Sequence, residues 1–178
     1  VSVGLDHMEW LGPDLAAIAR EKAGIFRSGR PAVCGMADPP AALIETATAL
    51  GAPLQLRGRD FVARENQDGS WDFSDAGGRL ERLPPPALAG VVQVGNAATA
   101  LAALRALSPR RVIFRGAGER GWRDVHLPGR FQRVPSRIGF EWVFDVAHNP
   151  DAAAVLAANL ARWPVPGRTT AVCGMLAD

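Results

Sequence analysis

The sequence predicts an α/β fold, and three observations support this prediction. Short apolar runs, which are typical of buried strands, alternate along the chain with segments of helical periodicity. The clearest helix lies between a Pro-Asp pair at 13–14 and Gly24, which mark its start and its end. Near the end of the chain, the order strand, helix, strand implies a parallel pair of strands with a right-handed crossover.

The first half of the chain contains alternating elements. In chain order, we expect a strand at 1–5, a helix at 13–24, a buried strand at 31–36, an alanine-rich helix at 40–50 and alternating strands across 53–73. Within the last stretch, residues 67–70 (Gln-Asp-Gly-Ser) have the composition of a hairpin turn. Three consecutive prolines at 84–86 predict a rigid connector.

The second half begins with a helix and ends with the strand–helix–strand pattern. We expect Asn96 to cap a helix at 97–107, with Ala98, Leu101 and Leu104 on one side. Residues 108–132 are rich in Arg and Gly and are the preferred linker between domains. A strand at 140–146, a helix opened by Asn149-Pro150 and reaching about residue 162, and a strand at 169–175 follow.

Length and composition limit the class of protein. The 178 residues, of which 48% are hydrophobic, suffice for one domain or for parts of two, and the net charge of +2 does not by itself imply a nucleic-acid partner. No apolar run approaches the roughly 20 residues that span a bilayer. Cys34 and Cys173 lie in separate strand-like runs, so we interpret them as reduced core residues of a cytoplasmic protein. Because the chain starts without Met in an apolar run, we expect part of a longer protein.

Lys22 is the only lysine in the chain. An arginine is always protonated, whereas a lysine can lose its proton and act as a primary amine. Helical spacing places Lys22 on the same face as Leu15, Ile18 and Ala19, which is the apolar face. The position therefore favours amine chemistry. A solvated charge near the negative pole of the helix is the alternative interpretation.

Polar residues follow two of the apolar runs directly. Asp6 and His7 follow the first run, and Asp145 ends the strand at 140–146, with His148 in the loop behind it. In open parallel sheets, ligands bind beyond the carboxyl ends of the strands, and the N-terminus of the following helix suits a phosphate. His7 is a candidate metal ligand through a neutral imidazole nitrogen. The alternative is an Asp that caps a helix and a His that packs at a domain edge.

Two further motifs suggest other classes of function. Residues 116–121 fit the G-x-G-x-x-G pattern of dinucleotide-binding oxidoreductases, but Pro128 follows too closely for the required helix. The arginines within 110–123, with Trp122 among them, are compatible with binding to phosphates or to single-stranded nucleic acid. No nucleic-acid-binding module surrounds them, so a solvated loop is the preferred interpretation.

Five stretches in a fixed order carry a family resemblance. They are residues 6–12, 20–26, 96–101, 127–132 and 145–150. In this order and spacing they resemble the bifunctional dihydrofolate synthases/folylpolyglutamate synthases, a family of the ATP-dependent Mur ligase superfamily. The resemblance implies that residues 1–128 form the C-terminal part of a P-loop-type Mur ligase central domain. It also implies that residues 129–178 begin a Rossmann-like C-terminal domain.

The resemblance also implies a reaction. In this family ATP phosphorylates a carboxylate, the amine of L-glutamate attacks the acyl phosphate, and ADP and phosphate leave. The acceptors are dihydropteroate and folates that already carry glutamate, so the enzyme serves folate biosynthesis and one-carbon metabolism. The expected cofactors are ATP and Mg²⁺. We expect a cytoplasmic monomer with no nucleic-acid or membrane partner.

Residue roles follow from the same resemblance, position by position. It implies His7 as a magnesium ligand, Lys22 as a catalytic lysine carbamate that also binds magnesium, Asn96 beside the adenine, Arg130 on the ATP phosphates, Asp145 as a nucleotide ligand and His148 as a catalytic residue facing the phosphates. Only an unprotonated amine reacts with carbon dioxide, and arginine does not deprotonate in proteins. The single lysine therefore suits the carbamate role.

One departure from the family pattern concerns the phosphate-binding loop. The family has a Gly-rich loop that ends in Gly-Lys-Ser or a similar sequence, and no such loop occurs in residues 1–178, where Lys22 is the only lysine. We therefore expect the chain alone to lack synthase activity. The nearest alternative is another Mur-type ligase that acts on a peptidoglycan precursor, but the sequences at 10–12 and 129–132 favour the folate branch.

Overall fold

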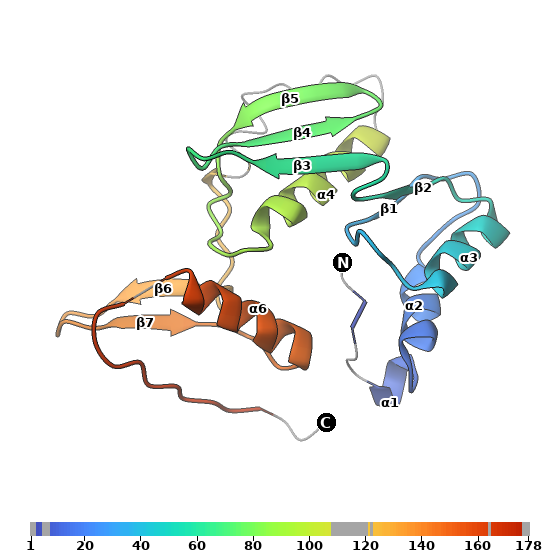
Figure 1. The fold of residues 1–178 in the computed structure, drawn as a ribbon. Helices are drawn as coiled ribbons and strands as arrows, with labels where there is room; N and C mark the ends of the chain where they lie inside the picture. Colours follow the sequence, from blue (N-terminus) through green and yellow to red (C-terminus); the bar gives the residue numbers. More distant parts are fainter. Residues whose placement is uncertain (1–2, 5–7, 108–120, 122, 164, 176–178) are drawn as a thin grey trace.

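The computed structural model describes residues 3–4, 8–107, 121, 123–163 and 165–175, and it confirms the α/β class. Figure 1 shows two parts: an N-terminal unit (the described residues up to 107) and a C-terminal unit (those from 121 onward). The N-terminal unit contains α1 (Met8–Leu11), α2 (Leu15–Ala23), β1 (Ala32–Cys34), α3 (Ala41–Leu50), β2 (Leu54–Leu56), β3 (Phe61–Glu65), β4 (Trp71–Asp75), β5 (Gly78–Leu83) and α4 (Gln93–Leu107). The C-terminal unit contains β6 (Gln132–Pro135), β7 (Glu141–Phe144) and α6 (Pro150–Ala161).

The helix that carries Lys22 forms as predicted, but its buried stripe is shifted. Asp14 caps α2 by accepting a hydrogen bond from the Ala17 amide at 2.7 Å. Ile18 and Ala19 are fully buried, whereas Leu15 is 44% exposed and Lys22 is half-buried. The predicted apolar face is therefore wrong at Leu15, because the helix packs against α3 through the Ile18, Ala19 and Ala23 side.

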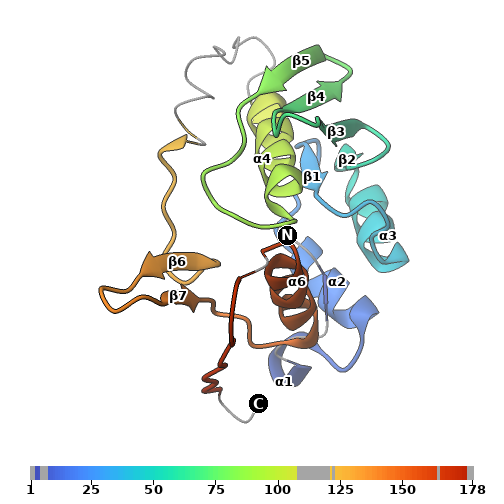
Figure 2. The same ribbon diagram turned by 60° about the vertical axis from the view of Figure 1, so that its left-hand side comes forward.

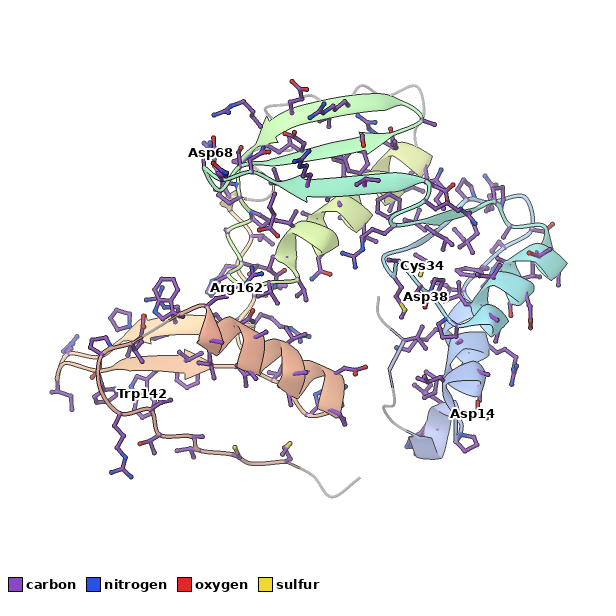
Figure 3. All side chains as sticks on the ribbon, viewed as in Figure 1. Asp14, Cys34, Asp38, Asp68, Trp142 and Arg162 are labelled. Carbon is purple, nitrogen blue, oxygen red and sulfur yellow. The ribbon has the colours of Figure 1, made fainter. Side chains whose placement is uncertain are left out.

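The first core lies between two helices and a short parallel sheet. β1 and β2 pair in parallel, with Ala32 opposite Leu54, and α3 connects them. Gly51 ends α3 with φ +63°, the left-handed conformation that glycine adopts without steric cost. Buried Cys34 contributes its side chain to this core, as predicted (Figure 3).

The second core lies between α4 and an antiparallel sheet of β3, β4 and β5. The predicted hairpin turn is confirmed: the Asn66 amide donates to the Ser70 carbonyl at 2.8 Å, and Gly69 has φ +80°. β5 was not predicted. Trp71 and Phe73 are fully buried against Leu101 of α4, and the Trp71 indole donates to the Pro84 carbonyl at 2.9 Å. The proline connector thus also closes this core.

The predicted start of α4 is wrong. The helix begins at Gln93, and Asn96 lies inside it, donating its backbone amide to the Val92 carbonyl at 3.0 Å. Asn96 is therefore not the cap, because the chain already turns at Gly90, whose carbonyl accepts from the Gln93 amide. Ala98 and Leu101 are buried as expected, but Leu104 is 49% exposed.

The C-terminal unit differs most from the prediction. α6 forms where predicted, with the Asn149 side chain accepting from the Ala152 amide at 2.8 Å. The predicted strand at 140–146 forms as β7, but its neighbour is the unpredicted β6, and the two strands pair antiparallel.

The predicted strand at 169–175 is wrong. Residues 165–175 form no strand, Val172 is 90% exposed, and Cys173 is exposed rather than in a core. A strand requires a hydrogen-bonded neighbour, and no described strand pairs with this segment. The predicted parallel β-α-β pair is therefore absent from the described residues.

Some predictions fall outside the described residues. These include Asp6, His7, the glycine motif at 116–121 except Gly121, and most of the arginine run and linker at 108–132. Among the described residues, no helix is both long enough and apolar enough to cross a membrane.

Candidate functional site

Asp145 joins two of the motif segments into one structure. It follows β7, and its Oδ2 accepts a hydrogen bond from the Phe131 amide at 2.9 Å. Its Oδ1 accepts from the Ala147 amide at 2.8 Å, which turns the chain toward α6. The Val146 amide donates to the Gly129 carbonyl at 2.9 Å, so backbone hydrogen bonds connect the same two segments. The structure thus places 129–132 against 145–149.

This paired arrangement depends on two unusual backbone positions. Phe131 is 5% exposed and has φ +46°, a conformation that is uncommon for a bulky residue. Gly129 has φ +70°, and a Cβ there would lie 2.8 Å from a methyl group of Val146. Such positions persist where their surroundings fix them, and they concentrate at functional sites. We call residues 129–132 and 145–149 the paired loops.

Arg130 and His148 both lie on the paired loops and are exposed. No described residue is hydrogen-bonded to or ion-paired with the Arg130 guanidinium. The His148 ring Nδ1 lies 2.8 Å from the Val146 carbonyl, which fixes the orientation of the ring. Arg130, Asp145 and His148, which the sequence predicts to share a site, are therefore brought together.

The paired loops lead directly into α6. Asn149 caps this helix, so the chain reaches the positive end of the helix dipole just after His148. Asp151, in the first turn, lies against Gly4 of the N-terminal unit, where an added Cβ would overlap its carboxylate. The start of α6 therefore touches the N-terminal segment, three residues before His7 in the sequence.

Lys22 and Asn96 lie elsewhere, on two different helices of the N-terminal unit. Lys22 is in the last turn of α2, and no described residue is hydrogen-bonded or ion-paired to its amine. Asn96 is exposed near the start of α4, and its side-chain amide lies 3.3 Å from the Gln93 side-chain oxygen. Among the described residues, no hydrogen bond or ion pair joins either of them to the paired loops, so the structure does not link these predicted site residues to Arg130, Asp145 and His148.

A cavity of about 310 Å³ lies next to Asn96 at the start of α4. Its lining includes Arg57, Glu65, Val91 and Gly95. An added Cβ at Gly95 would overlap the Arg57 guanidinium, so this glycine allows the cation to lie against the helix. Among the described residues, nothing is hydrogen-bonded to or ion-paired with that guanidinium.

The described residues do not complete a metal site by themselves. No group of three or more His, Cys, Asp or Glu side chains gathers within the part of the chain that the structure describes. His7, the predicted metal ligand, lies outside that part.

The strongest pKa shift among the described residues lies in the β-hairpin, away from the paired loops. There the Arg82 amide, the Arg79 guanidinium and the Asn66 amide lower the pKa of Asp72 to about 2.

Sequence reasoning missed two residues that organise this region. Phe131 belongs to a motif segment, but only the structure reveals its left-handed backbone. Asn159 is 6% exposed on α6, and it accepts a hydrogen bond from the Val91 amide of the N-terminal unit at 2.8 Å. One feature of the sequence could have indicated the burial of Asn159: it lies one helical turn beyond the apolar pair Val155 and Leu156, on the same face of the helix.

Comparison with known proteins shows which family contains the paired loops. Residues 129–178, which include both paired loops, match the family described as "Mur ligase, glutamate ligase domain". The dihydrofolate synthase/folylpolyglutamate synthase of Escherichia coli K12 is 46% identical over 177 residues, which are 99% of this chain and 40% of that protein. The chain belongs to the dihydrofolate synthase/folylpolyglutamate synthase family. The predicted family is thereby confirmed.

Other members of the family agree with this assignment. The dihydrofolate synthase/folylpolyglutamate synthase of Haemophilus influenzae is 33% identical over 193 residues, covering 99% of this chain and 43% of that protein. The chain thus spans about 40% of the length of these curated relatives.

Solved structures of the family have the same fold over most of this chain. The structure of E. coli FolC in complex with DHPP and ADP has a TM-score of 0.82 and 45% identity, and the match covers 93% of this chain and 38% of that one. The bifunctional enzyme of Yersinia pestis complexed with AMPPNP and Mn ion has a TM-score of 0.76 and 40% identity over 90% of this chain and 37% of that one.

Proposed function

We propose that this chain is the part of an ATP-dependent amide ligase that holds the adenine, the phosphates and one side of the metal site. The enzyme would add L-glutamate to dihydropteroate and to folyl-glutamates through an acyl phosphate. The paired loops at the start of α6 carry this proposal, since they hold Arg130, Asp145 and His148 together. The proposal is supported by relatives that are named for both synthase activities and by a family structure in complex with DHPP and ADP.

We propose that the chain divides at residue 128/129 into a central-domain part and a C-terminal-domain part. The division is supported by the match to the glutamate ligase domain, which begins at residue 129. It is also supported by separate packing, since no described residue beyond 107 belongs to the two cores of the N-terminal unit. The nucleotide would then contact both parts, with Asn96 on one and Asp145 on the other.

The donors on the paired loops fit an adenosine triphosphate. An exposed guanidinium with no described partner suits phosphate oxygens, which Arg binds in a bidentate manner. Asp145 already accepts two backbone hydrogen bonds, so it holds both loops in place, and the free lone pairs of its oxygens can accept from a nucleotide hydroxyl. His148 lies beside the start of α6, where negative charge is favoured. These residues would orient the γ-phosphoryl group toward the substrate carboxylate.

Lys22 and His7 would form the metal side of the site. Lys22 is half-buried and its amine has no described partner, and a carbamate formed on it would be an anionic oxygen ligand. Bound Mg²⁺ would neutralise charge that develops on the transferring phosphoryl group. Asn96, exposed beside the cavity at the start of α4, would contact the adenine.

We further propose a cytoplasmic monomer that binds folate substrate and L-glutamate, with no nucleic-acid or membrane partner. The free thiols of Cys34 and Cys173 support a reducing compartment. Family structures complexed with AMPPNP and L-glutamate or with folate support the substrate classes.

The test is ligase activity of the full-length protein that carries this sequence. With dihydropteroate, L-glutamate, ATP and Mg²⁺, we expect glutamate-dependent ADP release. We expect Arg130→Ala to lower kcat/KM by about 100-fold or more, as the loss of a charge-stabilising donor does. The control, Arg137→Ala in the turn between β6 and β7, should retain activity because Arg137 lies at the far end of this sheet.

Lys22→Arg tests the carbamate role. Arginine keeps the positive charge but cannot form the carbamate, so turnover should be abolished, whereas Arg20→Lys on the same helix should be active. Full activity of Lys22→Arg would overturn this role. The 178-residue chain alone should release no ADP under these conditions. Glutamate-dependent ADP release from it would contradict the expectation that it is insufficient for synthase activity.

A further inference from the structure

α6 contacts the N-terminal unit at both of its ends. Figures 1 and 2 both show the helix below α4. At its start, Asp151 lies against Gly4, and near its end, Asn159 contacts the segment that leads into α4. Arg162, labelled in Figure 3, caps the end of the helix. α6 therefore bridges the two units.

Asn159 makes the more specific of these two contacts. Its Oδ1 accepts a hydrogen bond from the backbone amide of Val91 at 2.8 Å, across 68 residues of sequence. The side chain is 6% exposed, and it is the one buried polar side chain recorded for the described residues. An amide that is removed from water requires a partner, because an unpaired one is costly. The orientation of α6 and the position of Val91 are therefore coupled.

The Asn159 side chain fits into a space that a glycine leaves open. Gly90 has φ +137°, and a Cβ on it would lie 3.0 Å from Asn159 Nδ2 and 3.2 Å from Oδ1. A substituted residue at this position would be strained in its backbone and would press on the amide. The contact is thus shaped from both sides: a polar side chain on α6 and a bare backbone before α4.

The two partners of this hydrogen bond lead to the two halves of the proposed nucleotide site. Val91 lies two residues before α4 and lines the cavity beside Asn96. It therefore lies on the side of the proposed site that would hold the adenine. Asn159 lies on the helix that starts just after His148, on the phosphate side. A change in the contact would therefore change the position of one half relative to the other.

We propose that Asn159 is a positioning residue for nucleotide binding. Its hydrogen bond to Val91 fixes α6 against the start of α4, and it thereby sets the spacing between Asn96 on one unit and Asp145 and His148 on the other. This inference rests on the proposed nucleotide site. It adds a role for a residue that contacts neither the nucleotide nor the substrate.

Asn159→Leu in the full-length protein tests the proposal. Leucine has a similar size but no acceptor, and the matched control is Ala157→Leu on the exposed face of the same helix. We expect the KM for ATP and the dissociation constant for ADP to rise about tenfold, which corresponds to about 1.4 kcal/mol, with kcat changed less than about twofold. Asn159→Asp retains an acceptor oxygen and should recover much of the affinity. A merely structural role would lower the melting temperature without this split between KM and kcat.

A second variant approaches the contact from the other side. Gly90→Ala should weaken nucleotide binding in the same way, and its effect should not add to that of Asn159→Leu, since both remove one contact. Gly78→Ala is the control, because Gly78 has φ +114° but nothing within 4 Å of an added Cβ. Additive effects of the two variants would overturn the shared contact.

Hydrogen exchange at the Val91 amide separates the possible failures. In the full-length protein this amide should be protected, and Asn159→Leu should remove the protection. Unchanged exchange would show that the contact does not form, and it would overturn the proposal whatever the activity. Lost protection with unchanged ADP affinity would overturn the positioning role. Absence of ligase activity in the wild-type protein would instead refute the proposed function, while ADP affinity would still decide the role of Asn159.

Discussion

The β3–β5 sheet and the β6–β7 sheet differ in how they bury aromatic side chains. Trp71 and Phe73 of the first are fully buried beneath α4, whereas Trp142 and Phe144 of the second are 49% and 48% exposed. Figure 3 shows Trp142 projecting from β7 away from the N-terminal unit. The first sheet is stabilised by a closed hydrophobic core. The second has only two strands among the described residues, and the Asp145 carboxylate joins the segments at one end of it.

The buried sheet contributes to stability, whereas the predicted site residues lie beside the exposed sheet. The closed core contains none of the predicted site residues, while the exposed paired loops contain Arg130, Asp145 and His148. Elements that bind ligands and move are drawn from the less stable parts of a protein. We therefore expect substitutions in the two regions to have different kinds of effect.

The largest expected effect is on the closed core. Trp71→Ala removes a fully buried indole and its hydrogen bond to Pro84, and it should lower the free energy of unfolding by about 3–5 kcal/mol. The matched substitution Trp142→Ala in the second sheet should cost less than about 1.5 kcal/mol, because half of that side chain is already exposed. Urea unfolding of the 178-residue chain measures both. Equal losses would refute the contrast between the sheets.

A smaller and local effect is expected on the paired loops. Asp145→Ala leaves the Phe131 and Ala147 amides without their acceptor. The free energy of local opening of the paired loops should therefore fall by about 1–3 kcal/mol. Hydrogen exchange at these two amides should accelerate, while the unfolding midpoint of the β3–β5 core should stay unchanged. The corresponding aspartate in the closed region, Asp75, also accepts from the amide two residues on, that of Gly77. Asp75→Ala should instead shift that midpoint, since Asp75 also pairs with Arg105 of α4.

The helix caps allow a closer comparison of the N-terminal and C-terminal units, because α2 and α6 begin with the same kind of hydrogen bond. Asp14 and Asn149 each accept from the amide three residues on, at 2.7 and 2.8 Å. Removing either cap should destabilise its helix by about 1 kcal/mol. We expect Asp14→Ala to lower the cooperative unfolding midpoint and Asn149→Ala to increase fraying of α6 alone. Exchange data that show the same cooperative response for both would contradict this difference between α2 and α6.

The smallest expected effect is a pH dependence confined to the β-hairpin. The folded pKa of Asp72 is about 2, below its ordinary value of 3.8, so its charged form is favoured in the folded state. The contribution is therefore fully present above about pH 4 and is lost as the pH falls through about 2. Asp72→Asn should flatten the acid limb of the stability curve for β3–β5 and leave exchange in β6–β7 unchanged. An unaltered acid limb would contradict this assignment.

The sequence by itself determined the local features of this protein. The caps of α2 and α6, the hairpin turn at 67–70 and the α3 helix depend on residues close together in the chain, so short patterns predict them. The five motif segments also predicted the family, which the relatives confirm. The residue roles stay predictions.

Only the tertiary structure decided which segments meet. β7 pairs with the unpredicted β6 and not with 169–175, and α4 begins three residues before Asn96 because Gly90 starts the turn. The burial of Asn159 and the left-handed backbone of Phe131 likewise depend on partners 68 and 14 residues away. Strand pairing and burial depend on such long-range contacts, whose free energies have no counterpart in local propensity. The sequence thus specified the parts of the proposed site, and the contacts of α6 with the N-terminal unit specified their arrangement.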